Sequence, residues 1–283
     1  MTTTAAETEG ERSIRYLAPN LITLTSLLFG VTSVAASYHH NWDLAGWMII
    51  YSVLCDRLDG LVARRLRATS ELGMQLDSLA DFLNFGLAPP FLVYAYLCAR
   101  PDLPFDDGWE RPYLLAACAL WVLAAAFRLA RFNIHSDETA PTRVYFGVPT
   151  TLAGGTVAIW FLAFLKYSVP GPTFGGPKVF GGWITPHAVW LWMPVAIAIG
   201  GLLMASTVRI PKVGKTANKA TTAAVLVLVL FGYVCGFARL LPEVMAWQPT
   251  VWLVTFLVMG LFSERLKSLE PPPLFPRRPD SSS

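Results

Sequence analysis

The chain carries little charge for its length. Of its 283 residues, only 14% are charged, whereas 54% are hydrophobic and the aromatic residues include 10 Trp and 17 Phe. A typical soluble domain carries roughly 25% charged residues, and a water-soluble globule of this length could not cover its surface with so few charges. The composition therefore excludes a soluble enzyme and a disordered chain. It predicts a polytopic helical membrane protein.

Paired cysteines and a basic leader are also missing. The four cysteines each lie in an apolar stretch without a CxxC spacing, so they resemble small hydrophobes and exclude a secreted disulfide scaffold and a zinc site. The net charge of +3 is too small to imply nucleic-acid binding. The first ten residues, MTTTAAETEG, are polar and acidic, so we expect no cleaved signal peptide.

Long apolar stretches recur along the chain. A spanning helix needs about 20 mostly apolar residues. The candidates are 17–37, 44–66, 72–98, 113–133, 148–167, 188–208, 220–240 and 244–262. The sequence therefore predicts an all-α polytopic fold with about eight transmembrane helices.

Basic residues are distributed unevenly between the two sets of loops and helix ends. One set holds 16 of the 22 Lys and Arg: Arg12, Arg15, Arg64, Arg65, Arg67, Arg128, Arg131, Arg143, Arg209, Lys212, Lys215, Lys219, Arg265, Lys267, Arg277 and Arg278. The other set holds Arg100, Arg111, Lys166, Lys178 and Arg239, and Arg57 lies within a helix. By the positive-inside rule the richer side is cytoplasmic. We therefore expect a multi-pass protein of the cell inner membrane with both termini in the cytoplasm.

The segment 56–81, DRLDGLVARRLRATSELGMQLDSLAD, places four aspartates in or beside spanning helices. An ionised carboxylate inside a bilayer costs at least about 3 kcal/mol, and such residues are functional candidates by default. The alternative is a cytoplasmic loop with solvated charges. However, the apolar runs GWMIIYSVLC and FLNFGLAPPFLVYAYLC adjoin the two ends of the segment. The carboxylates are therefore expected at, or just inside, the cytoplasmic ends of two helices.

Helical geometry predicts that these carboxylates converge. At about 100° per residue, Asp56, Asp59, Gly60 and Ala63 share an arc of about 100°, whereas Gly73, Asp77 and Asp81 form one stripe of the next helix. Two such faces joined by a short basic turn can point at each other. The carboxylates would then repel one another unless cations neutralise them, and all-oxygen ligands favour hard cations such as Mg²⁺, Mn²⁺ or Ca²⁺.

Small residues and one arginine accompany the carboxylates. Gly60, Ala63 and Gly73 allow a ligand to approach the backbone closely, and Arg64 supplies a fixed cation suited to phosphate. Carboxylates, a hard metal, small residues and an arginine together suggest phosphoryl-transfer chemistry.

The complete pattern is Asp56-x2-Asp59-Gly60-x2-Ala63-Arg64-x8-Gly73-x3-Asp77-x3-Asp81, which specifies eight positions over 26 residues. It resembles the signature of the CDP-alcohol phosphatidyltransferases, and PNLITLTSLLFG (19–30) is similar to the family's first helix. These membrane enzymes join an alcohol to a CDP-linked lipid and release CMP. The resemblance covers roughly 12–262 and implies a six-helix catalytic core.

The resemblance implies a set of site residues. Two divalent cations, Mg²⁺ or Mn²⁺, would be held by Asp56, Asp59 and Asp77, with Asp81 at the edge of the metal site and acting as the general base. Arg64 would contact a phosphate, and Gly60, Ala63 and Gly73 would make room for the cytidine end of the nucleotide. The start of the first helix would also reach the nucleotide, through Asn20 and Thr23.

Two further segments indicate the acceptor alcohol. FRLARFN (127–133) and YFGVPT (145–150) resemble the phosphatidylserine synthase branch of the family, whereas LMASTVRIPKVGK (203–215) departs from its commoner pattern. The substrates implied are CDP-diacylglycerol and L-serine. The expected serine-binding residues are Arg128, Arg131, Asn133 and Tyr145, with arginine suited to a bidentate grip on carboxylate. The alternative role for the two arginines is anchoring to anionic lipid headgroups.

Two other functions compete with this prediction. A sister enzyme could use inositol phosphate, glycerol 3-phosphate or choline, and Arg128, Arg131 and Arg143 could then bind a phosphorylated acceptor. A cation or proton-coupled transporter would also contain intramembrane carboxylates, but they would be spread across the depth of the membrane. Here all four lie toward one side.

The chain is expected to have four parts. These are a cytoplasmic N-terminal segment (1–16), the catalytic core (17–210), additional C-terminal transmembrane helices (211–262) and a disordered cytoplasmic tail (263–283). The family resemblance also implies a homodimer.

Overall fold

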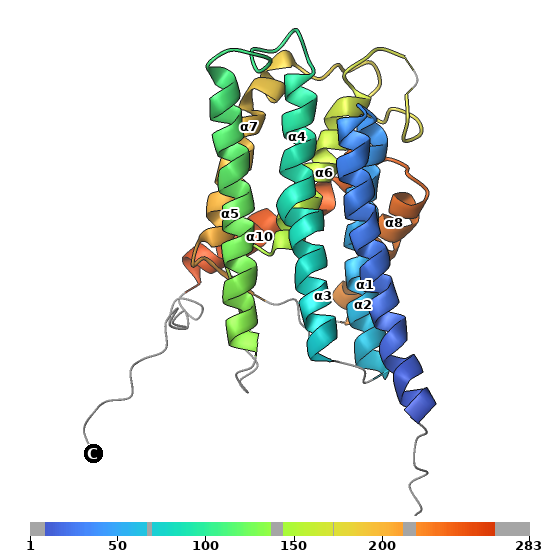
Figure 1. Ribbon diagram of the computed structural model, residues 1–283. Coiled ribbons are helices and arrows are strands. Elements are labelled where there is room, and N and C mark those ends of the chain that lie inside the picture. Colours follow the sequence, from blue (N-terminus) through green and yellow to red (C-terminus); the bar gives the residue numbers. More distant parts are fainter. Residues whose placement is uncertain (1–8, 67–69, 137–143, 172, 212–218, 264–283) are drawn as a thin grey trace, which may run out of the picture.

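The protein is a helical bundle, shown in Figure 1 as a computed structural model that describes residues 9–66, 70–136, 144–171, 173–211 and 219–263. The helical elements are α1 (Glu9–Tyr38), α2 (Trp42–Leu66), α3 (Glu71–Asp81), η1 (Phe82–Leu87), α4 (Ala88–Cys98), α5 (Glu110–Ser136), α6 (Thr150–Lys166), α7 (His187–Ala205), α8 (Lys219–Phe237), α9 (Pro242–Met245) and α10 (Trp247–Phe262). The predicted tail lies outside the described residues, except for Ser263. The predicted boundary between 17–210 and 211–262 falls beside 212–218, which lie outside the described residues, so that division stays a prediction.

Two short strands interrupt the helical pattern. Within the described part of the chain, β1 (Val144–Phe146) pairs antiparallel with β2 (Arg209–Pro211), and Tyr145 lies opposite Ile210. The all-α prediction missed this pair because three-residue strands leave no periodic signal in the sequence. The next residue, Gly147, has a φ of +78° and donates its backbone N–H to Val208 O at 2.8 Å. The strand pair therefore joins the segment before α6 to the segment after α7.

Among the described residues, four stretches are long and apolar enough to cross a membrane: Leu17–Tyr38, Glu110–Asn133, His187–Ala205 and Pro242–Phe262. They match four of the eight predicted spans. The predicted spans 148–167 and 220–240 correspond to shorter apolar helices, Thr150–Lys166 and Thr222–Phe237. The remaining two fall on α2 and on the run from α3 to α4. The protein is thus mostly helical, with four candidate spans in the part of the chain that the structure describes, and a total of eight remains a prediction.

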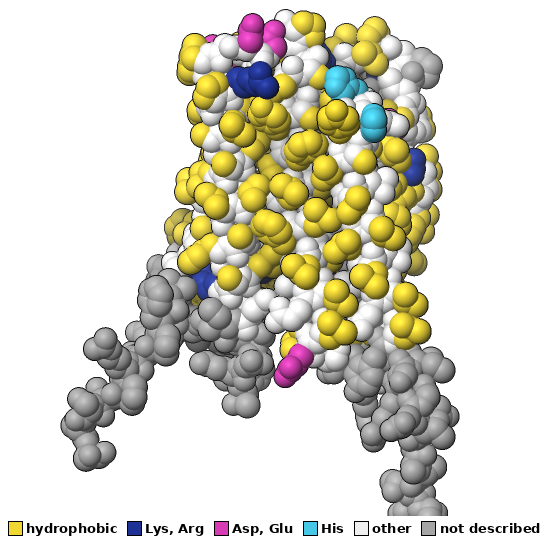
Figure 2. Space-filling view, viewed as in Figure 1, with side chains coloured by type: hydrophobic (Ala, Val, Ile, Leu, Met, Phe, Trp, Pro, Cys, Tyr) yellow, Lys and Arg dark blue, Asp and Glu magenta, His cyan; other side chains and the backbone are white. Residues whose placement is uncertain are grey.

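The surface of the bundle is apolar along most of its height. Large hydrophobic side chains point outward on several helices, including Leu28 (60% exposed), Leu123 (68%) and Leu226 (67%). On the face shown in Figure 2, charged side chains gather toward the two ends and yellow hydrophobic side chains cover the region between them. Such a surface would be costly in water but is suited to lipid.

The continuous helical run α3–η1–α4 passes through the middle of the bundle (Figure 1). Its central segment, η1, is a π-helical turn packed against neighbours on several sides. Trp121 of α5 donates its indole N–H to Phe85 O at 3.0 Å. A Cβ at Gly154 of α6 would lie only 2.8 Å from the Cβ of Phe85, so this glycine lets α6 approach η1 closely. Contacts from α5 and α6 therefore fix the position of η1, the π-helical turn within this run.

A buried ion pair lies at the C-terminal end of α6. Lys166 Nζ lies 2.8 Å from Glu243 Oε1, and the two side chains are 0% and 2% exposed. The ammonium also donates to Gly175 O and Pro177 O, both at 2.9 Å. Glu243 accepts from Tyr167 Oη and from the backbone N–H of Val179, both at 3.2 Å. These contacts attach the α6–α7 connection and α9 to the end of α6.

Removing one partner of this ion pair should strongly destabilise the fold. Lys166→Met leaves an unpaired buried carboxylate, and we expect a loss of about 3–5 kcal/mol in the free energy of unfolding. The double variant Lys166→Met/Glu243→Leu should recover most of that loss. Denaturant titration of the purified protein in detergent micelles measures both values.

Lys178→Met is the matched control, because Lys178 in the same connection is only half-buried and contacts the Val169 carbonyl and the ring of Tyr167 rather than a carboxylate. We expect a change of at most about 1 kcal/mol, the range for such a cation–π contact. Equal unfolding midpoints for Lys166→Met and Lys178→Met would contradict the role of the ion pair.

Candidate active site

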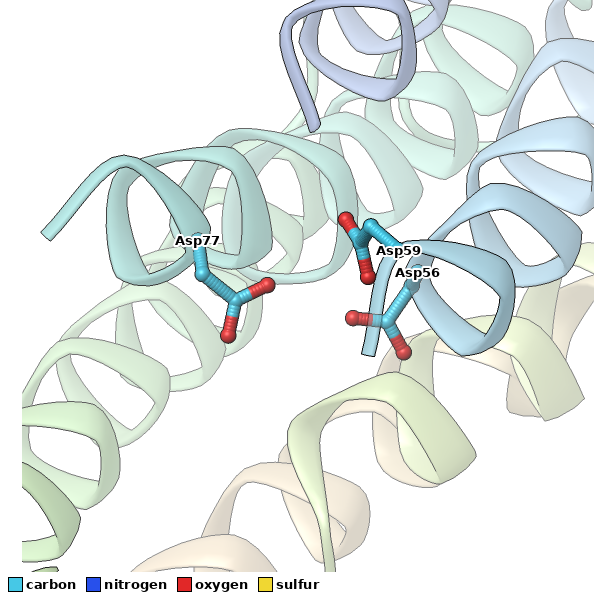
Figure 3. Close-up of side chains that lie close together, drawn as sticks. All are labelled: Asp56, Asp59 and Asp77. Carbon is cyan, nitrogen blue, oxygen red and sulfur yellow. The ribbon is translucent and has the colours of Figure 1, made fainter. Parts of the chain in front are cut away.

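Three of the four predicted aspartates meet between α2 and α3. Asp56 and Asp59 lie on the last turns of α2, and Asp77 lies on α3. One carboxylate oxygen from each comes within 4.8 Å of those of the other two. Figure 3 shows their carboxylates directed into the space between the two helices. This is the arrangement that the helical spacing predicts.

Asp81 lies beside this group at the end of α3. Its side chain neighbours that of Asp56, which also has Thr151, at the start of α6, as a neighbour. Asp81 is not part of the set of three carboxylates with mutually close oxygens. The structure therefore places it next to the cluster, at the position the sequence predicts for the edge of the site.

Asp59 is the most firmly held carboxylate of the cluster. It is 6% exposed, its Oδ2 accepts a hydrogen bond from Thr23 Oγ1 at 2.8 Å, and its Oδ1 accepts from the backbone N–H of Gly60 at 2.6 Å. Thr23 was predicted to reach the nucleotide. In the structure its hydroxyl is turned toward Asp59, a contact that sequence reasoning missed because 36 residues separate the two.

The small residues lie where the predicted ligand would need space. A Cβ at Gly60 would meet the guanidinium of Arg64 at 3.3 Å, so this exposed arginine lies over the bare backbone of Gly60. A Cβ at Gly73 would meet Asn20 Oδ1 at 3.1 Å, so α1 also reaches this part of the site. Ala63 is half-buried on the same helix as Gly60. These positions are compatible with the nucleotide-binding residues that the sequence predicts, and their role stays a prediction.

Arg128 is buried next to the carboxylates. It is 7% exposed, and Asp56 and Asp81 are both among its charged neighbours. One of its Nη atoms donates to Thr150 Oγ1 at 2.8 Å, whereas its Nε has no hydrogen-bond partner among the described residues. A buried guanidinium is costly unless it is paired, so Arg128 balances part of the negative charge of the aspartates.

Arg131 has different surroundings, although it lies one turn after Arg128 on α5. Its guanidinium donates to Phe146 O at 2.7 Å, Ser206 O at 3.0 Å and Ala205 O at 3.3 Å. It thereby ties α5 to the two segments that carry the strands. Sequence reasoning treated the two arginines alike, because their contacts come from segments far away in the chain.

The other two predicted serine-binding residues contact different elements. Asn133 Nδ2 donates to Ser78 Oγ at 3.0 Å, and Ser78 is the neighbour of Asp77 on α3. The ring of Tyr145 packs 6.4 Å from the ring of Phe132. Sequence reasoning did not single out Ser78, Thr150 or Thr151, because hydroxyl residues at helix ends are common and carry little signal by themselves.

The cluster is chemically suited to a hard cation. Carboxylate oxygens are the ligands that Mg²⁺ and Mn²⁺ prefer, and three carboxylates at such short separation repel one another unless positive charge neutralises them. Nearby arginines supply only part of that charge. The donor set therefore fits the divalent metals that the sequence predicts, next to an exposed arginine that can bind phosphate.

Fold and site together define a class: a membrane-embedded helical protein with an aspartate cluster between its second and third helices. The family model for CDP-alcohol phosphatidyltransferase matches residues 16–198, well over half of the chain. The chain belongs to the CDP-alcohol phosphatidyltransferase family. The predicted resemblance is therefore confirmed, and the aspartate signature lies inside the matched region.

Curated relatives carry a more specific name. The chain is 33% identical over 202 residues to the CDP-diacylglycerol–serine O-phosphatidyltransferase of Helicobacter pylori, covering 71% of this chain and 74% of the relative. It is 28% identical over 259 residues to the Mycobacterium leprae protein of that name, covering 90% and 78%. The Bacillus subtilis protein of that name is 31% identical over 142 residues, covering 50% and 73%.

The hydrogen bond from Thr23 should support metal binding. Thr23→Ala leaves Asp59 Oδ2 without this donor, and we expect the affinity for Mn²⁺ to fall about 10–100-fold, as when other partners of metal ligands are removed. Electron paramagnetic resonance of free Mn²⁺ in titrations of the purified protein measures the affinity. Thr25→Ala is the control, because the exposed Thr25 donates to Leu21 O of its own helix. Equal Mn²⁺ affinities of the two variants would contradict this role.

Proposed function

We propose that the protein transfers the phosphatidyl group of CDP-diacylglycerol to the hydroxyl of L-serine, which yields phosphatidylserine and CMP. The observation that carries the proposal is the cluster of Asp56, Asp59 and Asp77, whose oxygens lie within 4.8 Å of one another inside the family's signature. The names of the relatives support serine as the acceptor.

Two divalent cations, Mg²⁺ or Mn²⁺, would be held by Asp56, Asp59 and Asp77, with Asp81 at the edge. When bound, such ions neutralise phosphate charge and stabilise the leaving nucleotide. Thr23 and the N–H of Gly60 orient the carboxylate of Asp59, whereas Arg64 would bind a phosphate of the nucleotide. Gly60, Ala63, Gly73 and Asn20 would border the cytidine. The metal site thus combines ligands from α2 and α3 with support from α1.

In the reaction the serine hydroxyl oxygen attacks the phosphorus that carries the diacylglycerol. A new P–O bond forms to serine while the P–O bond to CMP breaks, and CMP leaves with that electron pair. Asp81 accepts the proton of the attacking hydroxyl. Its position beside Asp56, and outside the set of three close carboxylates, suits a base that acts next to the metal site.

The acceptor would bind between α3, α5 and the start of α6. Arg128 is the favoured partner of the serine carboxylate, because it is buried beside Asp81 and its Nε lacks a partner among the described residues. Arg131, Asn133 and Tyr145 complete the proposed set. Arg131 would act while it also binds backbone carbonyls, and Asn133 would act beside Ser78.

The donor lipid has an apolar groove next to the cluster. The groove encloses about 110 Å³. Its polar end includes Arg57 and Thr151, the neighbours of Asp56 in sequence and in space. The apolar lining comes from α2, α6, α8 and α10 and includes Ile50, Val53, Ile159, Val229 and Trp252. A groove with this lining can hold part of an acyl chain with its phosphate toward the aspartates.

We also propose where the enzyme lies in the cell and how its chain is organised. The uneven distribution of basic residues supports a site at the cytoplasmic face of the cell inner membrane with both termini in the cytoplasm. Residues 17–210 would form the catalytic core and 211–262 the additional helices. The working form would be a homodimer, as the family resemblance implies.

The central test is CMP release from CDP-diacylglycerol by the purified full-length chain. Serine should stimulate release in the presence of Mn²⁺ or Mg²⁺, and chelation of the metal should abolish it. Inositol phosphate, glycerol 3-phosphate and choline serve as competing acceptors. Release that depends on one of them and not on serine would assign a sister activity. Cation flux in liposomes without CMP release would instead indicate a transporter.

Asp81→Asn should separate binding from turnover. The amide keeps the shape of the side chain but cannot accept the proton, so we expect kcat to fall by at least about 100-fold, the lower range for loss of a general base. CDP-diacylglycerol binding should persist, as measured by equilibrium binding of a labelled donor. A variant that retains more than a tenth of the wild-type kcat would refute the assignment of Asp81 as base.

A further inference from the structure

A buried asparagine follows the aspartates on the π-helical turn η1. Asn84 is 1% exposed and lies three residues after Asp81. Its Nδ2 donates to Ser26 Oγ of α1 at 2.9 Å, whereas its Oδ1 has no hydrogen-bond partner among the described residues. A buried amide with one open acceptor costs stability in an apolar setting, so packing against neighbouring atoms must hold it in place.

Asn84 belongs to a polar junction of three helical elements. Ser26 Oγ lies 3.3 Å from Ser52 O of α2, and Ser52 Oγ lies 3.2 Å from Ser26 O. Both serines are buried. We call Ser26, Ser52 and Asn84 the polar junction. It connects α1, α2 and η1 about one helical turn away from the carboxylates, because Ser52 precedes Asp56 by four residues and Ser26 follows Thr23 by three.

Gly30 of α1 makes room for the asparagine. A Cβ at this position would overlap Asn84 Oδ1, with Leu83 also close. Asn84 Oδ1 therefore packs directly against the α1 backbone at Gly30. Small residues of this kind are common where helices pack closely in membranes. Any side chain at Gly30 must displace Asn84 from the junction.

A π-helical turn is a rare conformation that recurs at functional sites. The turn here begins directly after Asp81, so its shape sets how α3 is rotated relative to α4. Trp121 and Gly154 hold η1 at Phe85, on the side of α5 and α6. The polar junction holds the same turn from α1 and α2, which is the side where Asp56 and Asp59 lie.

We propose that Asn84 is a positioning residue for the carboxylate site. Through Ser26, Ser52 and Gly30 it fixes the depth and rotation of α3 against α2, so that Asp77 and Asp81 face Asp56 and Asp59. The inference rests on the proposed function only in that the carboxylates bind divalent cations. The identity of the acceptor alcohol does not enter it.

The experiment compares two matched serine variants of the full-length protein in detergent micelles. Ser26→Ala removes the acceptor of Asn84 and the hydrogen bond from Ser26 Oγ to Ser52 O, whereas Ser52 Oγ can still donate to the backbone carbonyl of residue 26. Ser33→Ala is the control, because Ser33 is a buried serine of α1 that donates to the α2 carbonyl of Ala45 at 2.9 Å, farther along the helix from the aspartates. Each variant is measured for Mn²⁺ affinity by electron paramagnetic resonance, for unfolding midpoint and for steady-state kinetics.

We expect Ser26→Ala to weaken Mn²⁺ binding at least about threefold, and Asn84→Ala and Gly30→Ala to weaken it at least about tenfold, within the range for residues that support metal ligands. In these variants kcat should fall while the KM for the acceptor stays near the wild-type value. Ser33→Ala should lower the unfolding midpoint about as much as Ser26→Ala and leave Mn²⁺ affinity unchanged.

Unchanged Mn²⁺ affinity in Ser26→Ala, with an unfolding midpoint lowered as in Ser33→Ala, would overturn the proposal and leave the junction a purely structural feature. If Asn84→Ala or Gly30→Ala does not fold, the comparison of Ser26→Ala with Ser33→Ala still tests the proposal. A wild-type protein that binds no Mn²⁺ would overturn the inference. One that binds Mn²⁺ but does not use serine would refute only the proposed acceptor.

Discussion

Repulsion between carboxylates is the constraint on which the rest of this structure depends. Asp56, Asp59 and Asp77 bring oxygens within 4.8 Å of one another at the ends of two helices in an apolar bundle. Without support, like charges at this separation would drive α2 and α3 apart. The neighbouring elements oppose that separation: α1 contributes Thr23 and Ser26, η1 contributes Asn84 and α5 contributes the buried charge of Arg128. A bound cation would complete the balance and thereby couple metal binding to the packing of the helices.

Buried charge has different surroundings at the two ends of α6. At its final residue, Lys166 and Glu243 neutralise each other, and backbone carbonyls and the Tyr167 hydroxyl complete their hydrogen bonding. At its start, Thr150 and Thr151 adjoin Arg128 and Asp56, at the edge of the aspartate cluster. The first arrangement contributes to the stability of the bundle. Under the proposed function, the second would bind a cation and an anionic substrate.

Neighbouring residues of similar type take different roles because the contacts around them differ. Arg128 and Arg131 lie one turn apart on α5, yet one is buried beside aspartates and the other binds three backbone carbonyls. Thr23 and Thr25 lie two residues apart on α1, yet only Thr23 reaches Asp59. Each difference reflects which segment of the chain packs against that side of the helix. Residue type and spacing alone therefore identify the region of the site but not the role of each member.

The sequence by itself determined the membrane class, the family and the convergence of the aspartates. These follow from composition and from a spacing repeated within two adjacent helices, which are local properties of the chain. Only the tertiary structure decided that Thr23 holds Asp59, that Arg131 binds carbonyls, that Lys166 pairs with Glu243 and that a π-helical turn follows Asp81. The physical reason is that these features arise where segments far apart in the chain come into contact. Such contacts satisfy buried polar groups, and no periodicity in the sequence records which partner each group will find.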